Sequence, residues 1–180
     1  MVRVCLMVLL ACSAGLGGCM TAAKETFYAV RGAQGKVIEV DPVGSLGKYD
    51  GFRVEAFQNG IGSVLPAEMP ALIQNKIRQR LVEETFLTDG GKRALTLRGK
   101  IVFIDVKGLG SGMISPMEEV VCHIELMNPA GKVLGWAVIA GRSQSRVRGG
   151  IDGEREIADG VSKGVVHWLV QNGIVKKEKE

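Results

Sequence analysis

A cysteine thiol at position 19 stands in a setting that points to covalent chemistry. Cys19 ends the stretch Leu16-Gly17-Gly18-Cys19, which follows a short cationic start at Arg3 and an apolar run over Val4–Ala11. The residues just before Cys19 are mostly small, as a peptidase cleft requires. The pattern predicts that the chain is cut before Cys19 and that this thiol is lipidated.

This N-terminus resembles the signal peptides of bacterial lipoproteins, on the residues quoted above. The resemblance implies that Cys19 becomes the first mature residue, with a diacylglycerol on its sulfur and an acylated amine. Met20, in place of Asp, implies transport to the outer membrane, with the folded part facing the periplasm or the cell surface. The alternatives are a plain secretory signal and a transmembrane anchor, although the apolar run is shorter than the roughly 20 residues that a span needs.

Removal of the signal leaves a nearly balanced chain. Arg3 is the one charged residue before the cut, so 22 basic and 19 acidic residues remain, a net charge of +3. A balance of this kind argues against nucleic acid as a partner, since such proteins carry a clustered basic face. Cys5 and Cys12 leave with the signal and Cys19 is acylated, which leaves Cys122 without a partner for an intramolecular disulfide.

Two short motifs could hold an anion or a metal. Gly108–Gly112 is rich in glycine, but a strand follows it, and phosphate loops open a helix. Cys122 and His123 are adjacent on a predicted strand, so their side chains point to opposite faces and cannot share one ion. His167 lies off the apolar stripe of a predicted helix and is expected to be exposed. We therefore predict no metal site.

No catalytic constellation follows from the sequence. The serines lack the strand-to-helix elbow of hydrolases, and neither histidine has an evident carboxylate to orient it. Asp105 and the pair Glu118-Glu119 are expected to be solvated charges at strand ends. The sequence predicts a protein that is not an enzyme and needs no cofactor.

Three arginines form a candidate anion-binding cluster. Arg142, Arg146 and Arg148 stand at even spacings, so in an extended segment all three project from one face. They precede a predicted helix whose free amides could share a phosphate or a carboxylate. The alternative is that they pair with the acidic residues that follow, which are Asp152, Glu154 and Glu156.

Hydrophobic periodicity predicts the elements that position these residues. Alternation predicts strands over Phe52–Ala56, Ala94–Val106, Glu119–Met127 and Val133–Ala140, with an edge strand in the preceding spacer at Lys36–Val40. The long second strand is expected to place Leu95, Leu97, Ile101 and Phe103 on one face. Spacing of i, i+3 and i+4 predicts two amphipathic helices, one with Met69, Leu72, Ile73, Ile77 and Leu81 on its apolar face, and one over Gly153–Asn172.

The predicted order is β-α-β-β-β-α, an α+β two-layer sandwich. We expect a mainly antiparallel sheet of four to five strands with both helices on one face. This order, and the turn Asn128-Pro129-Ala130-Gly131 before a tryptophan-containing strand, resemble a family of small Gram-negative lipoproteins known as a domain of unknown function. The expected organisation is a signal peptide (1–18), a lipidated N-terminus and tether (19–47), one domain (48–175) and a charged tail (176–180).

The functional hypothesis is an envelope interaction or assembly module, anchored in the bilayer through Cys19 and binding an envelope protein. The binding surface would be the Gly108–Met117 loop, a sheet edge or the open sheet face. The alternative is a small ligand-binding protein or hydrolase of the envelope, which would need a deep apolar cleft with convergent polar groups.

Overall fold

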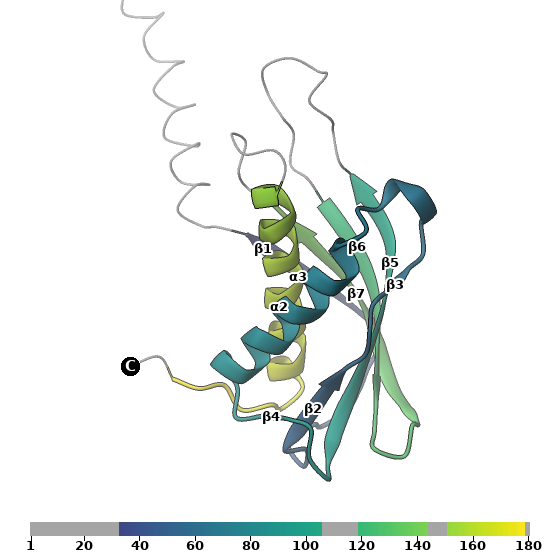
Figure 1. The fold of residues 1–180 in the computed structure, drawn as a ribbon. Coiled ribbons are helices and arrows are strands. Elements are labelled where there is room, and N and C mark those ends of the chain that lie inside the picture. The colour runs from purple at the N-terminus through teal and green to yellow at the C-terminus, as the bar shows by residue number, and fades with distance from the viewer. Residues whose placement is uncertain (1–32, 106–118, 144–150, 179–180) are drawn as a thin grey trace, which may run out of the picture. The chain divides into compact units, whose positions relative to one another are not determined.

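The computed structural model describes residues 33–105, 119–143 and 151–178. Figure 1 shows one layer of strands and one layer of helices. The strands belong to one seven-stranded sheet, in the order β1-β7-β6-β5-β2-β4, with β3 paired to β5. Their bounds are Gln34–Asp41 (β1), Gly51–Val54 (β2), Gln58–Asn59 (β3), Thr88–Asp89 (β4), Ala94–Asp105 (β5), Glu119–Met127 (β6) and Val133–Arg142 (β7). The helices are η1 (Gly62–Val64), α2 (Met69–Glu84) and α3 (Ile151–Gln171).

The α+β class is as predicted, but the sheet is mixed and has more strands than expected. The prediction did not include β3 and β4, and both β2 and β3 run parallel to β5. The physical reason is the connection between β2 and β5. It contains the helix α2, and a crossover of this length joins parallel strands. Strands β3 and β4 have two residues each, too few to leave a periodic signal.

The other half of the sheet is antiparallel, as predicted. β5 pairs with β6, β6 with β7, and β7 with β1, which is the edge strand. The turn between β6 and β7 has the expected chemistry: Gly131 has φ of 79°, and the Asn128 side-chain oxygen accepts hydrogen bonds from the amides of Ala130 and Lys132, both at 3.0 Å. A left-handed φ of this kind is open mainly to glycine.

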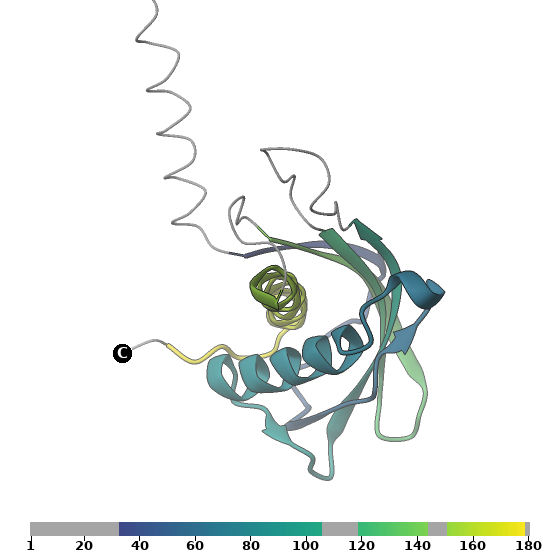
Figure 2. The same cartoon turned by 45° about the horizontal axis from the view of Figure 1, so that its top comes forward.

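Both helices cover the same, concave face of the sheet, as Figure 2 shows. The apolar stripe of α2 is buried at Met69, Ile73, Ile77 and Leu81, and that of α3 at Ile157, Val161, Val165, Trp168 and Leu169. These side chains meet the inward residues of the central strands, including Leu95, Leu97, Cys122, Ile124 and Ile139. The helix ends have suitable residues, because Pro70 lies in the first turn of α2 and Gly173, with φ of 100°, follows α3.

Glycines let α3 approach the sheet edge closely. A Cβ atom on Gly35 of β1 would lie 2.3 Å from the Gly160 carbonyl oxygen, and one on Gly160 would lie 2.6 Å from the Gln34 carbonyl oxygen. On β7, a Cβ on Gly141 would lie 2.5 Å from the Ile157 carbonyl oxygen. Backbone therefore packs on backbone here, and β1 is held between β7 and the helix.

The predicted inward face of β5 is wrong at Phe103. Leu95, Leu97 and Ile101 are fully buried, whereas Phe103 is 49% exposed. The register of β5 against β6 shifts between Ile101 and Phe103. A bulge inserts one extra residue, here Val102, and turns the following side chains to the other face.

Candidate functional site: the open face of the sheet

The face of the sheet turned away from the helices carries an apolar band that crosses four strands. Register places Ile38, Val138 and His123 in one row and Ala140, Val121 and Phe103 in the next. Trp136 and the apolar members of these two rows form the apolar band, which we define as Ile38, Phe103, Val121, Trp136, Val138 and Ala140. Ile38 and Phe103 are about half exposed, at 53% and 49%, and the other four are partly exposed.

Trp136, at one margin of the band, packs against His123, which lies among the side chains of the band. Their ring centroids lie 4.4 Å apart in an edge-to-face arrangement, at an interplanar angle of 85°. His123 Nε2 is shielded from solvent and has no hydrogen-bond partner among the described residues. The packing fixes both rings in place, so the band is a preformed surface and needs little ordering to bind a partner.

Charged residues of both signs flank the band. On one side Arg98 of β5 donates to the Glu55 carboxylate at 2.8 Å, and this hydrogen bond raises the pKa of Arg98. On the other side Arg142 of β7 pairs with Glu119 of β6 at 2.9 Å. Among the described residues that strand register or ion pairing places on the open face, five are basic and five acidic, which are Lys36, Arg53, Arg98, Lys100 and Arg142, and Asp41, Glu55, Asp105, Glu119 and Glu125.

The arginine cluster predicted from the sequence is seen only at its first member. Arg142 ends β7 on the open face and pairs with Glu119 across the strands. Arg146 and Arg148 lie outside the described residues, as do Cys19 and the Gly108–Met117 loop. Anion binding by the cluster therefore stays a prediction.

Cys122 and His123 lie on opposite faces of β6, as strand geometry predicts. Cys122 is fully buried in the core, and burial raises the pKa of its thiol far above the usual range. His167 is exposed, also as predicted. No group of three or more metal-ligating side chains occurs within residues 33–105, 119–143 and 151–178.

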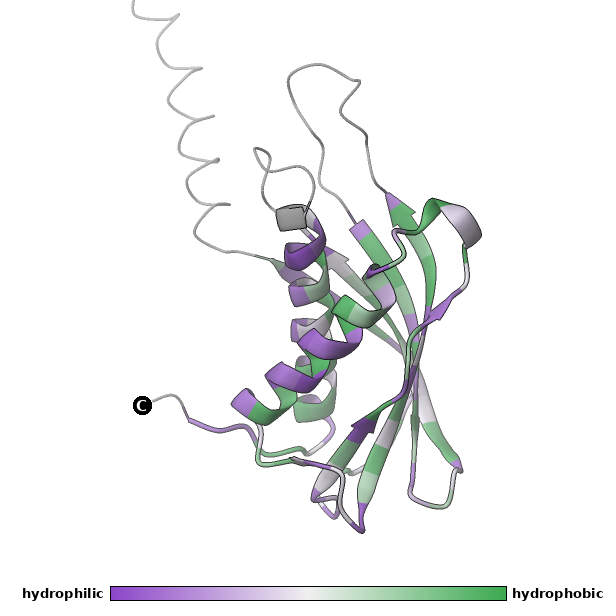
Figure 3. Ribbon diagram, viewed as in Figure 1, coloured by the Kyte–Doolittle hydropathy of each residue, from purple (hydrophilic) through white to green (hydrophobic). Residues whose placement is uncertain are grey.

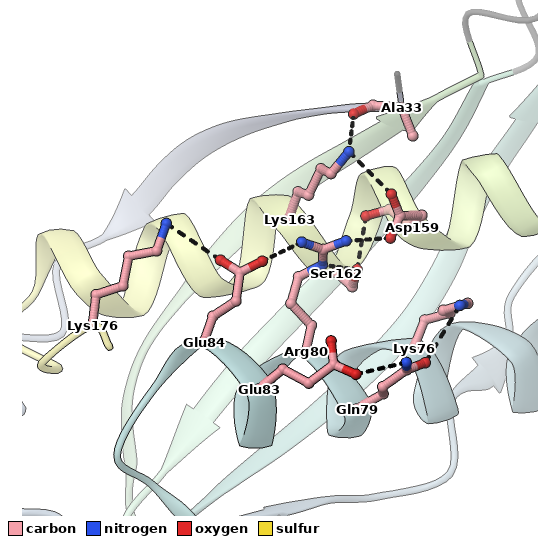
Figure 4. Close-up of polar contacts among 10 residues, drawn as sticks. All are labelled: Ala33, Lys76, Gln79, Arg80, Glu83, Glu84, Asp159, Ser162, Lys163 and Lys176. Carbon is pink, nitrogen blue, oxygen red and sulfur yellow. Dashed lines mark hydrogen bonds and ion pairs between the residues drawn. The ribbon is translucent and has the colours of Figure 1, made fainter. Parts of the chain in front are cut away.

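The structure contains a charged network between the helices that the sequence did not predict. Figure 4 shows Arg80 of α2 reaching α3, where its guanidinium binds the carboxylate of Asp159 while also binding Glu84 on its own helix. Its Nε donates to Ser162 Oγ at 2.9 Å. The detectable signal was the i, i+4 spacing of Arg80–Glu84 and Asp159–Lys163, which cannot show that the two pairs meet.

The network extends from the start of β1 to the residues after α3. Lys163 donates to the Ala33 carbonyl at 2.9 Å and pairs with Asp159 at 3.0 Å, and Lys176 pairs with Glu84 at 3.3 Å. Burial raises the pKa of both carboxyl groups, but the neighbouring cations outweigh it, so the pKa values of Glu84 and Asp159 are lowered. Three cations share two carboxylates here, and the pairs link α2 to α3, so we call the network a clamp between the helices.

Three surface grooves in the described part of the chain open to solvent. One, of about 320 Å³, runs beside the clamp and is lined by Arg80, Glu84, Lys163 and His167 among others. A second, of about 240 Å³, lies near Phe86 and Val175, and a third, of about 360 Å³, near Arg53 and Lys92. Their walls mix polar and apolar surface, unlike the enclosed apolar clefts of most small-molecule sites.

Helices in the part of the chain that the structure describes are too short or too polar to cross a membrane. No protein-family model and no curated protein matches the chain. The resemblance to a lipoprotein family therefore stays an expectation.

The fold is similar to that of PelC from Paraburkholderia phytofirmans, solved as a dodecamer. The identity is 16% and the TM-score 0.53, over 76% of this chain and 97% of PelC. A point variant of that dodecamer is similar at 15% identity and a TM-score of 0.51, with the same coverage. A minor lipoprotein from Acinetobacter baumannii is similar at 14% identity, over 72% of this chain and 98% of that chain, and its TM-score of 0.45 carries no argument. At these identities the likeness to PelC shows a shared fold.

Proposed function

We propose that this chain is a lipid-anchored, non-enzymatic assembly module of the bacterial envelope, and that its open sheet face docks another copy of the chain. Cys19 would carry the lipid, and the described domain would lie at the periplasmic side of the outer membrane. The apolar band on the open face is the observation that carries the proposal.

The exposure of the band favours a protein partner. Isolated exposed apolar residues are ordinary, but a contiguous apolar patch with a charged rim is typical of a protein interface. Ile38 and Phe103 lie at its two ends and Trp136 lies within it, so one partner surface could cover four strands. Tryptophan is among the residue types that most often dominate the binding energy of an interface.

The charges of the open face favour a second copy as that partner. Five basic and five acidic side chains leave the described face neutral, which disfavours nucleic acid, an acidic peptide or an anionic membrane as its partner. A surface that carries both signs can be complementary to a copy of the same protein. The likeness of the fold to PelC, a dodecamer, supports this choice.

The alternative of a ligand-binding protein or hydrolase finds less support. The three grooves described above open to solvent, and the candidate carboxylate Glu119 is held by Arg142 in an ion pair. An acid or base for hydrolysis needs a free and perturbed carboxyl group beside a substrate pocket.

The experiment compares two double variants in the mature chain. Ile38→Glu with Phe103→Glu places a charge at each end of the band, on side chains that are about half exposed and so need not disturb folding. Val64→Glu with Val133→Glu is the matched control, since these residues are 69% and 44% exposed and lie outside the band. Self-association is measured by analytical ultracentrifugation and by crosslinking in cells.

We expect the wild-type chain and the control to form an oligomer of defined size, and the band variant to associate at least about tenfold more weakly. A wild-type chain that stays monomeric at high concentration, with crosslinks only to other proteins, would refute self-assembly. Equal association of both variants would place the interface elsewhere.

A further inference from the structure

Three exposed apolar side chains gather where the end of α2 meets the chain after α3. Val82, Phe86 and Val175 are 47%, 65% and 64% exposed, and we call them the apolar tip. The Phe86 amide donates to the Val175 carbonyl at 3.4 Å, which shows that the two segments are adjacent. The groove of about 240 Å³ opens here, lined by Phe86 and Val175 and also by the ion pair of Asp50 with Arg93.

Two lysines lie against the aromatic rings of this region. Lys177 Nζ is 5.9 Å from the centre of the Phe86 ring and donates to the Val82 carbonyl at 2.6 Å. Lys48 Nζ is 5.4 Å from the centre of the Tyr49 ring. The described contacts of both ammonium groups are with rings and a carbonyl, while the nearby carboxylates of Glu84 and Asp50 bind Lys176 and Arg93.

We infer that the apolar tip rests in a phospholipid surface. The inference rests on the proposed lipid anchor, which would hold the domain beside a bilayer. Aromatic and aliphatic side chains with lysines at their edges suit the interface of a membrane, where the rings enter the acyl boundary and the ammonium groups reach lipid phosphates.

The lysines favour lipid over a protein partner at this tip. A protein that covered Phe86 would also take the Lys177 ammonium out of water, and a buried ammonium is costly unless a carboxylate meets it. The headgroup layer provides phosphates and water together, so both the ring and the ammonium group keep favourable surroundings.

The length of the preceding chain permits this contact. Fourteen residues, from Cys19 to Gly32, separate the proposed lipid from Ala33, and a chain of that length can span at most about 50 Å. The Ala33 carbonyl accepts a hydrogen bond from Lys163, and about 12 Å of helix lies between Lys163 and the end of α3. The apolar tip is therefore within reach of the anchored surface.

The test uses residues 19–180, with the Cys19 thiol coupled to a maleimide phospholipid in vesicles. Chemical coupling places the domain at the bilayer whether or not cells acylate Cys19. The quenching measurement therefore tests the tip even if the lipidation proposal fails. Cys122 is fully buried and should not compete for the maleimide. The vesicles contain phosphatidylcholine and phosphatidylglycerol with brominated acyl chains, which quench tryptophan that enters the membrane.

Phe86→Trp reports on the apolar tip and Val64→Trp is the matched control. Both positions are strongly exposed, at 65% and 69%, and α2, about 24 Å long, lies between them. Relative to the unsubstituted chain, we expect brominated lipid to roughly halve the emission that Phe86→Trp adds and to leave that of Val64→Trp unchanged. Adding Lys48→Gln and Lys177→Gln should weaken the quenching.

Absent quenching of Phe86→Trp, or equal quenching at both positions, would overturn the inference. Oligomer formation is measured on the same samples, so the inference can fail while self-assembly holds, and the reverse.

Discussion

Arg80 is the residue on which the helix layer depends. Its guanidinium binds Glu84 and Asp159, and its Nε donates to the buried Ser162 hydroxyl, which in turn donates to the Asp159 carbonyl at 2.7 Å. The side chains of Arg80, Glu84 and Asp159 are 19%, 15% and 27% exposed, so water screens them only in part. An arginine suits this position because its planar fork can serve three acceptors at once.

Arg80→Met should lower the free energy of unfolding by about 2–3 kcal/mol, because it leaves two partly buried carboxylates without their shared cation. Urea denaturation of the mature chain measures this. The control is Arg93→Gln, which removes an ion pair with Asp50 whose side chains are 64% and 50% exposed. An exposed pair of this kind should cost within about 1 kcal/mol. Equal losses of unfolding free energy in the two variants would show that the contacts of Arg80 contribute no more than an exposed ion pair.

Acid should loosen the same clamp. The pKa values of Glu84 and Asp159 are lowered in the folded chain, so their ion pairs stabilise it fully above the ordinary carboxyl pKa of about 4 and progressively less as the pH falls through the lowered values. Thermal unfolding measured from pH 7 to about pH 3 should show a falling Tm. Arg80→Met should show a smaller fall than wild type, and an identical pH profile in both would contradict the assignment.

At the scale of elements, the glycines between α3 and the sheet set the distance between the two layers. Gly160 and Gly164 on α3 face Gly35 on β1 and Ile139 on β7, with ideal Cβ positions within 2.6 Å of the facing atoms for Gly160, Gly164 and Gly35. For Gly160 the obstacles are backbone atoms, which cannot move aside as a flexible side chain can. The helix therefore accepts glycines that weaken it in exchange for close contact with the edge strand.

Gly160→Ala should destabilise the protein by about 1–3 kcal/mol despite the better helix propensity of alanine. The new methyl group would lie 2.6 Å from the Gln34 carbonyl oxygen and 3.0 Å from the Arg142 amide nitrogen. Ala71→Gly, at an exposed position of α2, measures the propensity term alone and should cost about 1 kcal/mol. Hydrogen exchange of β1 should rise in Gly160→Ala, and an increase in overall stability would disprove the steric argument.

At the scale of the whole molecule, surface chemistry differs from one side to another. Figure 3 shows polar residues along the outer side of the helices and apolar residues along much of the sheet. The clamp links the two helices through ion pairs, whereas the open face and the apolar tip leave apolar side chains in water. A module that exposes one apolar face to a copy of itself and one apolar tip to lipid fits assembly at a membrane surface.

Cys19→Ala should block maturation, because the thiol is the proposed acceptor of the lipid. We expect unprocessed precursor and no incorporation of labelled palmitate, measured in cells by gel shift and fluorography. Met20→Asp is the companion variant: it keeps the thiol, so it should still be labelled, but it should fractionate with the inner membrane. Normal processing of Cys19→Ala would refute lipidation and remove the anchor from the proposed function.

Local pattern determined much of this protein. The period of the apolar residues was enough to place α2, α3 and β6, because each of these elements buries one regular stripe and its local preference agrees with its final environment. Strand alternation alone separated Cys122 from His123, and the chemistry of Pro129 and Gly131 predicted the turn that joins β6 to β7.

Only the tertiary structure decided the direction of β2, the outward turn of Phe103 and the meeting of Arg80 with Asp159. Strand direction depends on which face a crossover helix covers, and a bulge depends on how two strands share a register. The apolar band is likewise a product of pairing, since Ile38 and Phe103 lie 65 positions apart in the chain and become parts of one surface only when β1, β7, β6 and β5 align. Contacts between distant segments leave no local trace, and that is why the surfaces proposed for function had to be found in the fold.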